Sequence, residues 1–197
     1  MKYKFLEEEI EYNGIQLKHL FNYEYGLVGN SILCFIGPAK VKEHLVDYED
    51  KLKNDFISSE QMMHFIIEIF DISLREAVVW QRLFISQIID YLKENRYLPN
   101  FKGIENVRVN RRGDDIFIDA KKFSVSIATL SFVSGLIHVG LNINVGNECP
   151  VNAIGFQDFY NSNNVKCDMK RIAEVLMKNF VEEFEDIQEA CYKVKEV

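Results

Sequence analysis

The chain of 197 residues is 48% hydrophobic and 27% charged, close to the averages of globular proteins. With 23 Lys and Arg against 30 Asp and Glu, its net charge of −7 excludes a general nucleic-acid-binding protein, which needs positive charge to displace counterions. No apolar run approaches the roughly 18 residues of a membrane span. The acidic segment 1–11 lacks the apolar core of a signal peptide, and the four cysteines form no Cys-x-x-Cys pair. We therefore expect a cytoplasmic protein without membrane or nucleic-acid partners.

The first third of the chain predicts strands separated by turns. Residues 4–20 should form two strands around the turn signal Asn13-Gly14, and Ser31–Ile36 should form a buried strand that ends at Gly37-Pro38. Residues 41–55 are acidic and irregular. The segment Met62–Phe70 is almost wholly apolar, and we interpret it as a strand, although its periodicity does not exclude a helix.

A long helix is predicted next, because Ser73 and Glu76 have the spacing of a capping box. The helix should run to about Asn95. It is apolar almost all round, so we expect it to lie deep in the domain, with Trp80 buried against the sheet that follows.

The second half of the chain predicts an antiparallel meander and a final helix. Four strand candidates cover residues 106–110, 115–119, 122–130 and 136–144, with short turn signals between them. In the last one, apolar residues alternate with a polar face that consists of His138, Gly140, Asn142 and Asn144. A helical period returns at Asp168, which we expect to be an N-cap.

This order of elements predicts an α+β fold, a mostly antiparallel sheet packed by helices. We expect one domain over residues 1–197. Residues 1–165 would supply the sheet and the long helix, and residues 166–197 would supply a C-terminal helical part.

The common nucleotide-binding and hydrolase motifs are absent, and the informative segment is residues 106–145. It contains Asp115 and, seven residues later, Lys122, and it ends in Asn142-Ile143-Asn144-Val145. This arrangement resembles the catalytic domain of biotin and lipoate protein ligases, a class II synthetase-like fold. The segments Asp47–Asp50 and His64–Glu68 also resemble a small prokaryotic family of unknown function on that fold.

The resemblance implies roles for these residues. Lys122 would contact the substrate carboxylate and the α-phosphate of ATP, where a point charge stabilises developing negative charge. Asp115 would hold Mg²⁺ or orient neighbouring donors. ATP and Mg²⁺ are thus the implied cofactors, and His138, Asn142 and Asn144 would line the ligand pocket.

The sequence also departs from the ligase pattern. Where the ligases carry a Gly/Arg-rich loop, residues 35–41 contain one Gly and one Lys. Val125 stands where a glycine usually follows the lysine. The cavity has thereby lost arginines, so we expect any ATP binding to depend on a metal ion.

Acidic and histidine residues outside that segment form a further set of candidates. Asp47, Glu49 and Asp50 could ligate a divalent metal together with a histidine. His64 and Glu68 share one face if their segment is a strand, and we expect both to face the cavity of Lys122, with Asp47 or Asp50 at its rim.

Three functions stay open at this point. The first is a protein that binds a small molecule, a nucleotide or a carboxylate, with adenylate formation or acyl transfer as its reaction if it is an enzyme. The second is a non-catalytic interaction or dimerisation module, which would form a homodimer. The third is a metal-dependent hydrolase built on the acidic and histidine residues.

Overall fold

The structure is a computed structural model that describes residues 1–95, 100–102, 106–161 and 165–195, without the side chains of 165–167. Its strands are β1 (Lys2–Glu9), β2 (Ser31–Val41), β3 (Ile57–Phe70), β4 (Val109–Arg112), β5 (Asp115–Ile118), β6 (Lys121–Lys122), β7 (Ser124–Leu130) and β8 (Ser134–Asn144). Its helices are α1 (Phe21–Glu24), α2 (Tyr48–Lys53), α3 (Leu74–Asn95) and α4 (Val165–Tyr192), with a short 3-10 turn at Phe156–Asp158. No helix of the described residues is both long and apolar enough to cross a membrane.

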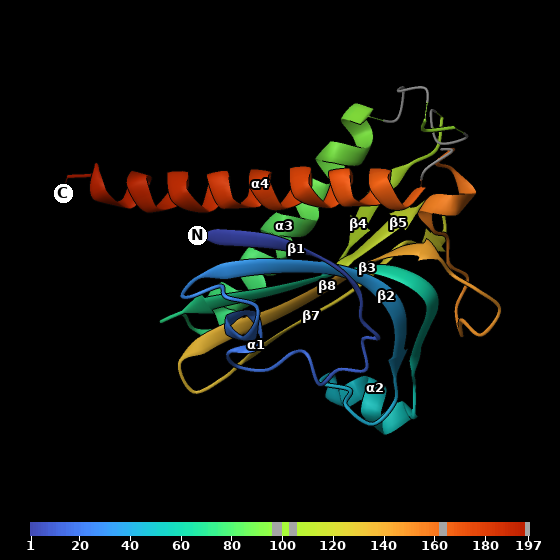
Figure 1. Cartoon of the computed structure of the whole chain (residues 1–197), viewed down its shortest axis with the longest axis horizontal. Coiled ribbons are helices and arrows are strands. Elements are labelled where there is room, and N and C mark those ends of the chain that lie inside the picture. Colours follow the sequence, from blue (N-terminus) through green and yellow to red (C-terminus); the bar gives the residue numbers. More distant parts are fainter. Residues whose placement is uncertain (96–99, 103–105, 162–164, 196–197) are drawn as a thin grey trace.

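The main sheet has five strands in the order β1-β2-β3-β8-β7 (Figure 1). Only β1 and β2 are parallel, and the other neighbours are antiparallel. The predicted α+β fold with a mostly antiparallel sheet is therefore confirmed.

The prediction of a single meander over residues 106–144 is wrong, because β4, β5 and β6 form a separate three-stranded sheet. The reason lies at Lys122, where β6 ends. Its backbone N–H donates to the Asn152 carbonyl, and its own carbonyl accepts from the Ile154 N–H. The chain thus leaves the small sheet, and β7 continues as a partner of β8.

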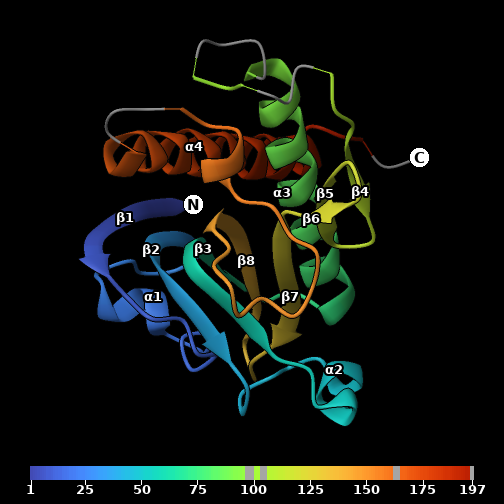
Figure 2. The same ribbon diagram turned by 90° about the vertical axis from the view of Figure 1, so that its right-hand side faces the viewer.

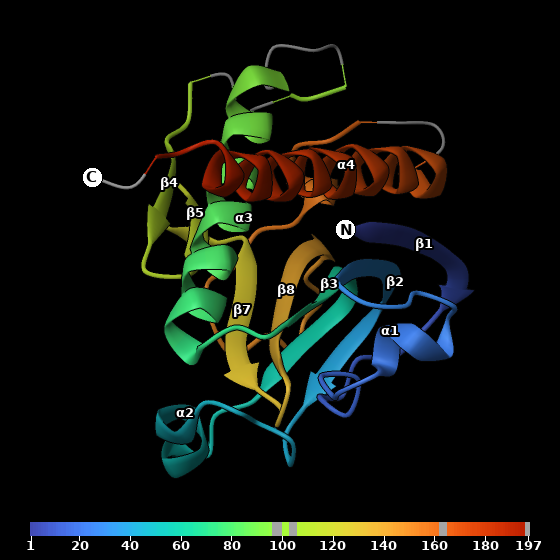
Figure 3. The ribbon, with the colours of Figure 1, turned by 90° about the vertical axis from the view of Figure 1, so that its left-hand side faces the viewer.

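Helices cover one face of the main sheet, and the loops and short helices lie on the other. Figure 1 shows α3 and α4 crossing above the sheet, with α1 and α2 below it. The two turned views agree, and they place the small sheet beside α3 (Figures 2 and 3). The largest apolar cluster lies between the sheet and the helices, and it joins Phe65, Phe84, Val139 and Phe180.

The alternation predicted for β8 decides what each face presents. Ile137, Val139 and Leu141 belong to the cluster under the helices. His138 stacks instead on Tyr12, which comes from the loop on the opposite face. The polar face of β8 therefore looks away from α3 and α4, toward the short helices.

The N-terminal segment differs from the predicted pair of strands around Asn13-Gly14. Residues 10–12 follow β1 along β2: Ile10 N–H donates to Ile36 O and Tyr12 N–H to Pro38 O. Tyr12 forms only an isolated bridge with Ala39. The turn at Asn13 leads into irregular chain, so the expected hairpin does not form.

The capping box that predicted α3 is present: the Ser73 N–H donates to the Glu76 carboxylate, and the Glu76 N–H donates to the Ser73 hydroxyl. The helix is not buried all round, because Val79 is exposed. Trp80 is half-buried, not fully buried as expected, and its ring packs on Phe180 and Phe184 of α4.

The final helix begins before the predicted N-cap. Because α4 starts at Val165, Asp168 lies in its first turn and not at its cap.

Gly37 allows a close approach between the backbones of β2 and residue Ile10. A Cβ at Gly37 would collide with the backbone carbonyl of Ile10, whereas a Cβ at Gly140 would meet mainly the flexible side chain of Met62. We expect Gly37→Ala to lower the free energy of unfolding by about 1–3 kcal/mol, and Gly140→Ala to lower it less. Urea unfolding of both variants measures the difference; equal losses would contradict the proposed backbone contact.

Candidate functional site

Two adjoining pockets lie on the sheet face that looks away from α3 and α4. The first, the His138 pocket, has a volume of about 230 Å³ and is lined by apolar residues and by Tyr12, His44, Asp47, Asp50, Asp114, Asp115, Lys122, Ser126 and His138. The second, the Asn142 pocket, has a volume of about 220 Å³ and is lined by Asp50, Met62, Lys122, Asn142, Cys149 and others. Both include Asp50, Ile57, Lys122 and Val125. These shared residues form the boundary between the two pockets.

Lys122 is the cation at this boundary, and its ammonium lies 2.8 Å from the carboxylate of Asp115. The short turn at Asp119, which has a φ of 54°, folds β6 back on β5 and so brings the two residues together. Burial raises the pKa of Asp115, although the lysine opposes the shift. The Asp–Lys interval seen in the sequence therefore corresponds to a half-buried ion pair.

The acidic cluster of residues 47–50 divides between structure and pocket. Asp47 is the N-cap of α2, and its carboxylate accepts from the N–H groups of Glu49 and Asp50. Glu49 pairs with Lys53 and lines neither pocket. Asp50 lines both, and its carboxylate has no hydrogen bond or ion pair within the described part of the chain. Burial, followed by the charges of Asp47 and Asp55, raises its pKa.

These acidic residues do not assemble with His64 as expected for a metal-dependent hydrolase. His64 is fully buried and bonds to another histidine and a backbone carbonyl. Among the residues described by the structure, no group of three or more His, Cys, Asp or Glu side chains could hold a metal ion.

His138 lines the His138 pocket, and His64 is fully buried behind it, with 3.0 Å between His64 Nδ1 and His138 Nε2. The expectation that His64 itself faces the cavity of Lys122 is therefore wrong, because His64 lines neither pocket. His64 Nε2 lies 3.2 Å from the carbonyl of Gly37. Tyr12 stacks on His138 with ring centroids 3.9 Å apart, and Phe35 stacks on His64. Burial lowers the pKa of His64 to about 3 and also lowers that of His138. Both imidazoles are therefore neutral near pH 7.

The two asparagines of β8 have different surroundings. Asn142 lines its pocket and also holds the adjacent loop, because its amide donates to the carbonyls of Lys122 and Ile154. Asn144 lies outside both pockets: its amide donates to Glu60, and its carbonyl accepts from the Gly146 N–H. The expectation that Asn144 shares a surface with Lys122 is wrong, because the strand ends there and the side chain turns to the rim.

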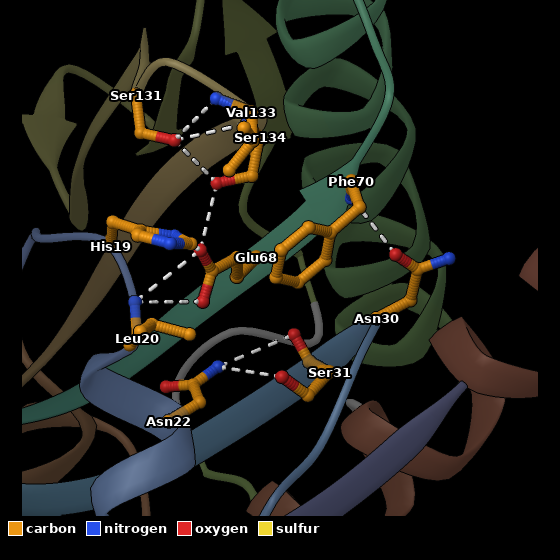
Figure 4. A network of polar contacts seen from close by, with 10 residues as sticks. All are labelled: His19, Leu20, Asn22, Asn30, Ser31, Glu68, Phe70, Ser131, Val133 and Ser134. Carbon is orange, nitrogen blue, oxygen red and sulfur yellow. Dashed lines mark hydrogen bonds and ion pairs between the residues drawn. The ribbon is translucent and has the colours of Figure 1, made fainter.

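Glu68 does not face the cavity of Lys122 either, which corrects the expectation from its strand phase. Its carboxylate contacts His19 at 2.7 Å, and it accepts hydrogen bonds from the Ser134 hydroxyl and the Leu20 N–H (Figure 4). Leu20 has a φ of 64°, a left-handed conformation that costs energy in leucine. Glu68 therefore fixes the strained end of the loop over the sheet, and its role is structural.

Tyr12 is the main site residue that the sequence did not indicate. It reaches the histidine pair only because residues 10–12 run along β2, a contact between distant parts of the chain. Asp114 also lines the His138 pocket, and Arg82 of α3 lies 3.7 Å from its carboxylate. Arg82 and Asp114 are brought together by the packing of α3, which no local sequence pattern predicts.

Comparison with known proteins places the fold and the family. The model of a family described as a domain of unknown function, DUF366, matches residues 1–195. An uncharacterised protein of Methanocaldococcus jannaschii is 27% identical over 191 residues, which cover 93% of this chain and 80% of that protein. A solved protein of unknown function from Pyrococcus horikoshi is 32% identical, with a TM-score of 0.84 and 99% of each chain covered.

Biotin and lipoate ligases share the fold at low sequence identity. The biotin protein ligase of Aquifex aeolicus, solved with biotin and ATP, gives a TM-score of 0.56 at 15% identity, over 95% of this chain and 72% of that one. A protein of T. acidophilum described as a candidate lipoate protein ligase gives 0.53 at 11%, over 94% and 86%. The resemblance seen in the sequence is therefore confirmed at the level of the fold.

The buried histidine pair makes stability depend on pH. An unfolded histidine titrates near pH 6.5, whereas His64 titrates at about 3 in the folded chain, so only the unfolded chain binds that proton between these values. Its stabilisation is present above pH 6.5 and is lost as the pH falls. Relative to pH 7.5, we expect a loss of about 2–3 kcal/mol from His64 at pH 4.5.

Urea unfolding at the two pH values measures this loss. The double variant His64→Phe/His138→Phe should show a shallower dependence, and His44→Gln, which removes an exposed histidine, should not change it. An unchanged slope in the double variant would mean that other groups cause the dependence.

Proposed function

We propose that this chain, which belongs to the DUF366 family, binds a small molecule across the His138 and Asn142 pockets, with Lys122 contacting a carboxylate or phosphate of the ligand. The observation that carries the proposal is the position of Lys122, which lines both pockets and is half-buried. A half-buried ammonium binds anionic groups more strongly than an exposed one, because less water screens its charge.

The charges around Lys122 restrict how an anion could bind. The His138 pocket is lined by the carboxylates of Asp47, Asp50, Asp114 and Asp115, against the single ammonium of Lys122. A bare polyphosphate would be repelled there. Mg²⁺ is usually bound through one or two carboxylates together with substrate phosphates, and the unpaired carboxylate of Asp50 fits that requirement. We therefore propose that a nucleotide would bind as its magnesium complex.

The fold supports a two-part ligand. The biotin protein ligase that shares this fold was solved with an acid and a nucleotide together. By analogy, two adjoining pockets with a lysine between them suit a small carboxylate beside a nucleotide, and adenylation would be the reaction class. Residues 35–41, however, belong to the end of β2 and carry no arginine. Without an arginine to stabilise the phosphates during the reaction, ligand binding is favoured over efficient catalysis.

Calorimetry with ATP and with octanoate tests this function. We expect Lys122→Gln to weaken binding of either by about tenfold or more, as for loss of a charged hydrogen bond. Its neighbour Lys121 is exposed and lines neither pocket, so Lys121→Gln is the matched control and should bind normally. ATP should bind more weakly in EDTA than in Mg²⁺, and Asp50→Asn should reduce that difference. No binding of ATP or octanoate to the wild-type chain would refute the proposal.

The second candidate function is an interaction module, and the tip of the β7–β8 hairpin favours it. Leu130, Phe132 and Val133 are exposed there, and Phe132 has its full side-chain surface in solvent. Exposed apolar clusters of this kind often mark protein contacts. Under this function the partner is a second copy of the chain, because β7 is an edge strand that could pair with its own equivalent.

Sedimentation velocity distinguishes this second function from the first. A homodimer through the hairpin should dissociate in the variant Phe132→Ser, whereas Tyr192→Ser, which alters an exposed aromatic residue on α4, should leave it intact. A wild-type chain that is monomeric at all concentrations would contradict the module.

A further inference from the structure

We infer that the His138 pocket binds a carboxamide group, whose N–H donates to Nδ1 of His138 and whose carbonyl accepts from the hydroxyl of Tyr12. The inference rests on the proposed small-molecule function and names the chemistry of the ligand end that enters this pocket. A carboxylate or phosphate end would be excluded from this position.

The backbone of β2 determines the protonation of the histidine pair. The Gly37 carbonyl can only accept, so His64 Nε2, at 3.2 Å from it, carries the proton of this imidazole. A neutral imidazole carries one proton, and His64 Nδ1 is therefore an acceptor. His138 Nε2, 3.0 Å away, must then be the donor. It follows that Nδ1 of His138 is unprotonated.

The stacked rings hold this arrangement in place. Tyr12 lies parallel to His138, with an angle of 14° between the rings, and Phe35 packs on His64. Both histidines are at most 2% exposed, so water does not compete for their ring nitrogens on the buried side. The low pKa values given above agree with a pair that stays neutral in the folded chain.

His138 Nδ1 has no hydrogen-bond partner in the part of the chain that the structure describes, and His138 lines the pocket. An acceptor in the wall of a pocket takes its donor from a ligand or water. The hydroxyl of Tyr12, which lines the same pocket, also has no partner among the described residues. Burial raises the pKa of Tyr12 well above its usual value, so this hydroxyl keeps its proton and can donate.

The remaining lining of the pocket agrees with an uncharged, partly apolar ligand end. Val41, Leu45, Val125 and Ile127 supply apolar walls. The hydroxyl of Ser126 is not free to donate to a ligand, because it bonds to Asp114. An anionic end would thus face an acceptor nitrogen and carboxylates, whereas an amide presents one donor and one acceptor to the two unpartnered atoms.

Two probes of equal length, hexanamide and hexanoate, test the inference on the whole chain. Long-range ¹⁵N–¹H NMR spectra report which nitrogen of each imidazole carries a proton. We expect both histidines of the pair to be protonated at Nε2, and hexanamide to shift the Nδ1 signal of His138. Hexanoate should leave that signal unchanged. A His138 protonated at Nδ1, or no shift with hexanamide up to its solubility limit, would overturn the inference.

Variants separate this result from the proposed function. His138→Phe keeps a ring to stack on Tyr12 but removes the Nδ1 acceptor, and it should weaken hexanamide binding about 3- to 10-fold, as for loss of one hydrogen bond. Lys121→Gln, which alters an exposed residue outside both pockets, should leave hexanamide binding intact. If ATP and octanoate fail to bind while hexanamide still shifts His138, the proposed function falls and the amide site stands. In Lys122→Gln, hexanoate cannot pair with the lysine. If hexanoate nevertheless binds this variant as tightly as hexanamide does, the amide site alone is refuted.

Discussion

The antiparallel pairing of β3 with β8 is the constraint on which the rest of the structure depends. Its register sets His64 opposite Gly140 and Ile66 opposite His138, so the two imidazoles lie diagonally across adjacent strands on one face. A shift of one residue between the two strands would place the histidines on opposite faces of the sheet and send the apolar side chains of one strand into the pockets. The apolar cluster beneath α3 and α4 prevents that shift, because it buries the alternate residues of the same two strands. The packing of the core therefore holds the site in position.

Features encoded by neighbours in the sequence could be predicted, and features that join distant segments could not. Ser73 and Glu76 are three residues apart and predicted the start of α3, and the alternation from His138 to Asn142 predicted a polar face. Asp115 and Lys122 meet through one tight turn. By contrast, His19 and Glu68 are 49 residues apart. Whether Glu68 faces a cavity or contacts the loop of His19 depends on where that loop lies, which the sequence around Glu68 does not indicate. Tyr12 was missed for the same reason, since only the docking of residues 10–12 on β2 brings its ring over His138.

The likeness to biotin and lipoate ligases is a likeness of fold, and the charges around Lys122 come from segments that connect the strands. Asp50 comes from the short helix α2, and Asp114 from the turn before β5. Both lie on connecting segments, where sequence changes are tolerated without disturbing the core. The charge around Lys122 can therefore change without a change in the sheet that positions the lysine.

The carbonyl of Gly37 has a consequence for how this pocket could evolve. Every residue has a backbone carbonyl, so no side-chain substitution at position 37 removes the group that orients the imidazole of His64. Because His64 donates to that carbonyl from Nε2, it accepts from His138 at Nδ1, and His138 Nδ1 is left as an acceptor. Mutation can discard the histidines, but it cannot reverse their polarity while they remain paired. Descendants of this sequence would therefore change ligand preference through Tyr12 or the surrounding loops. The direction of the hydrogen bond from His138 to His64 would stay the same, because the backbone of the sheet sets it.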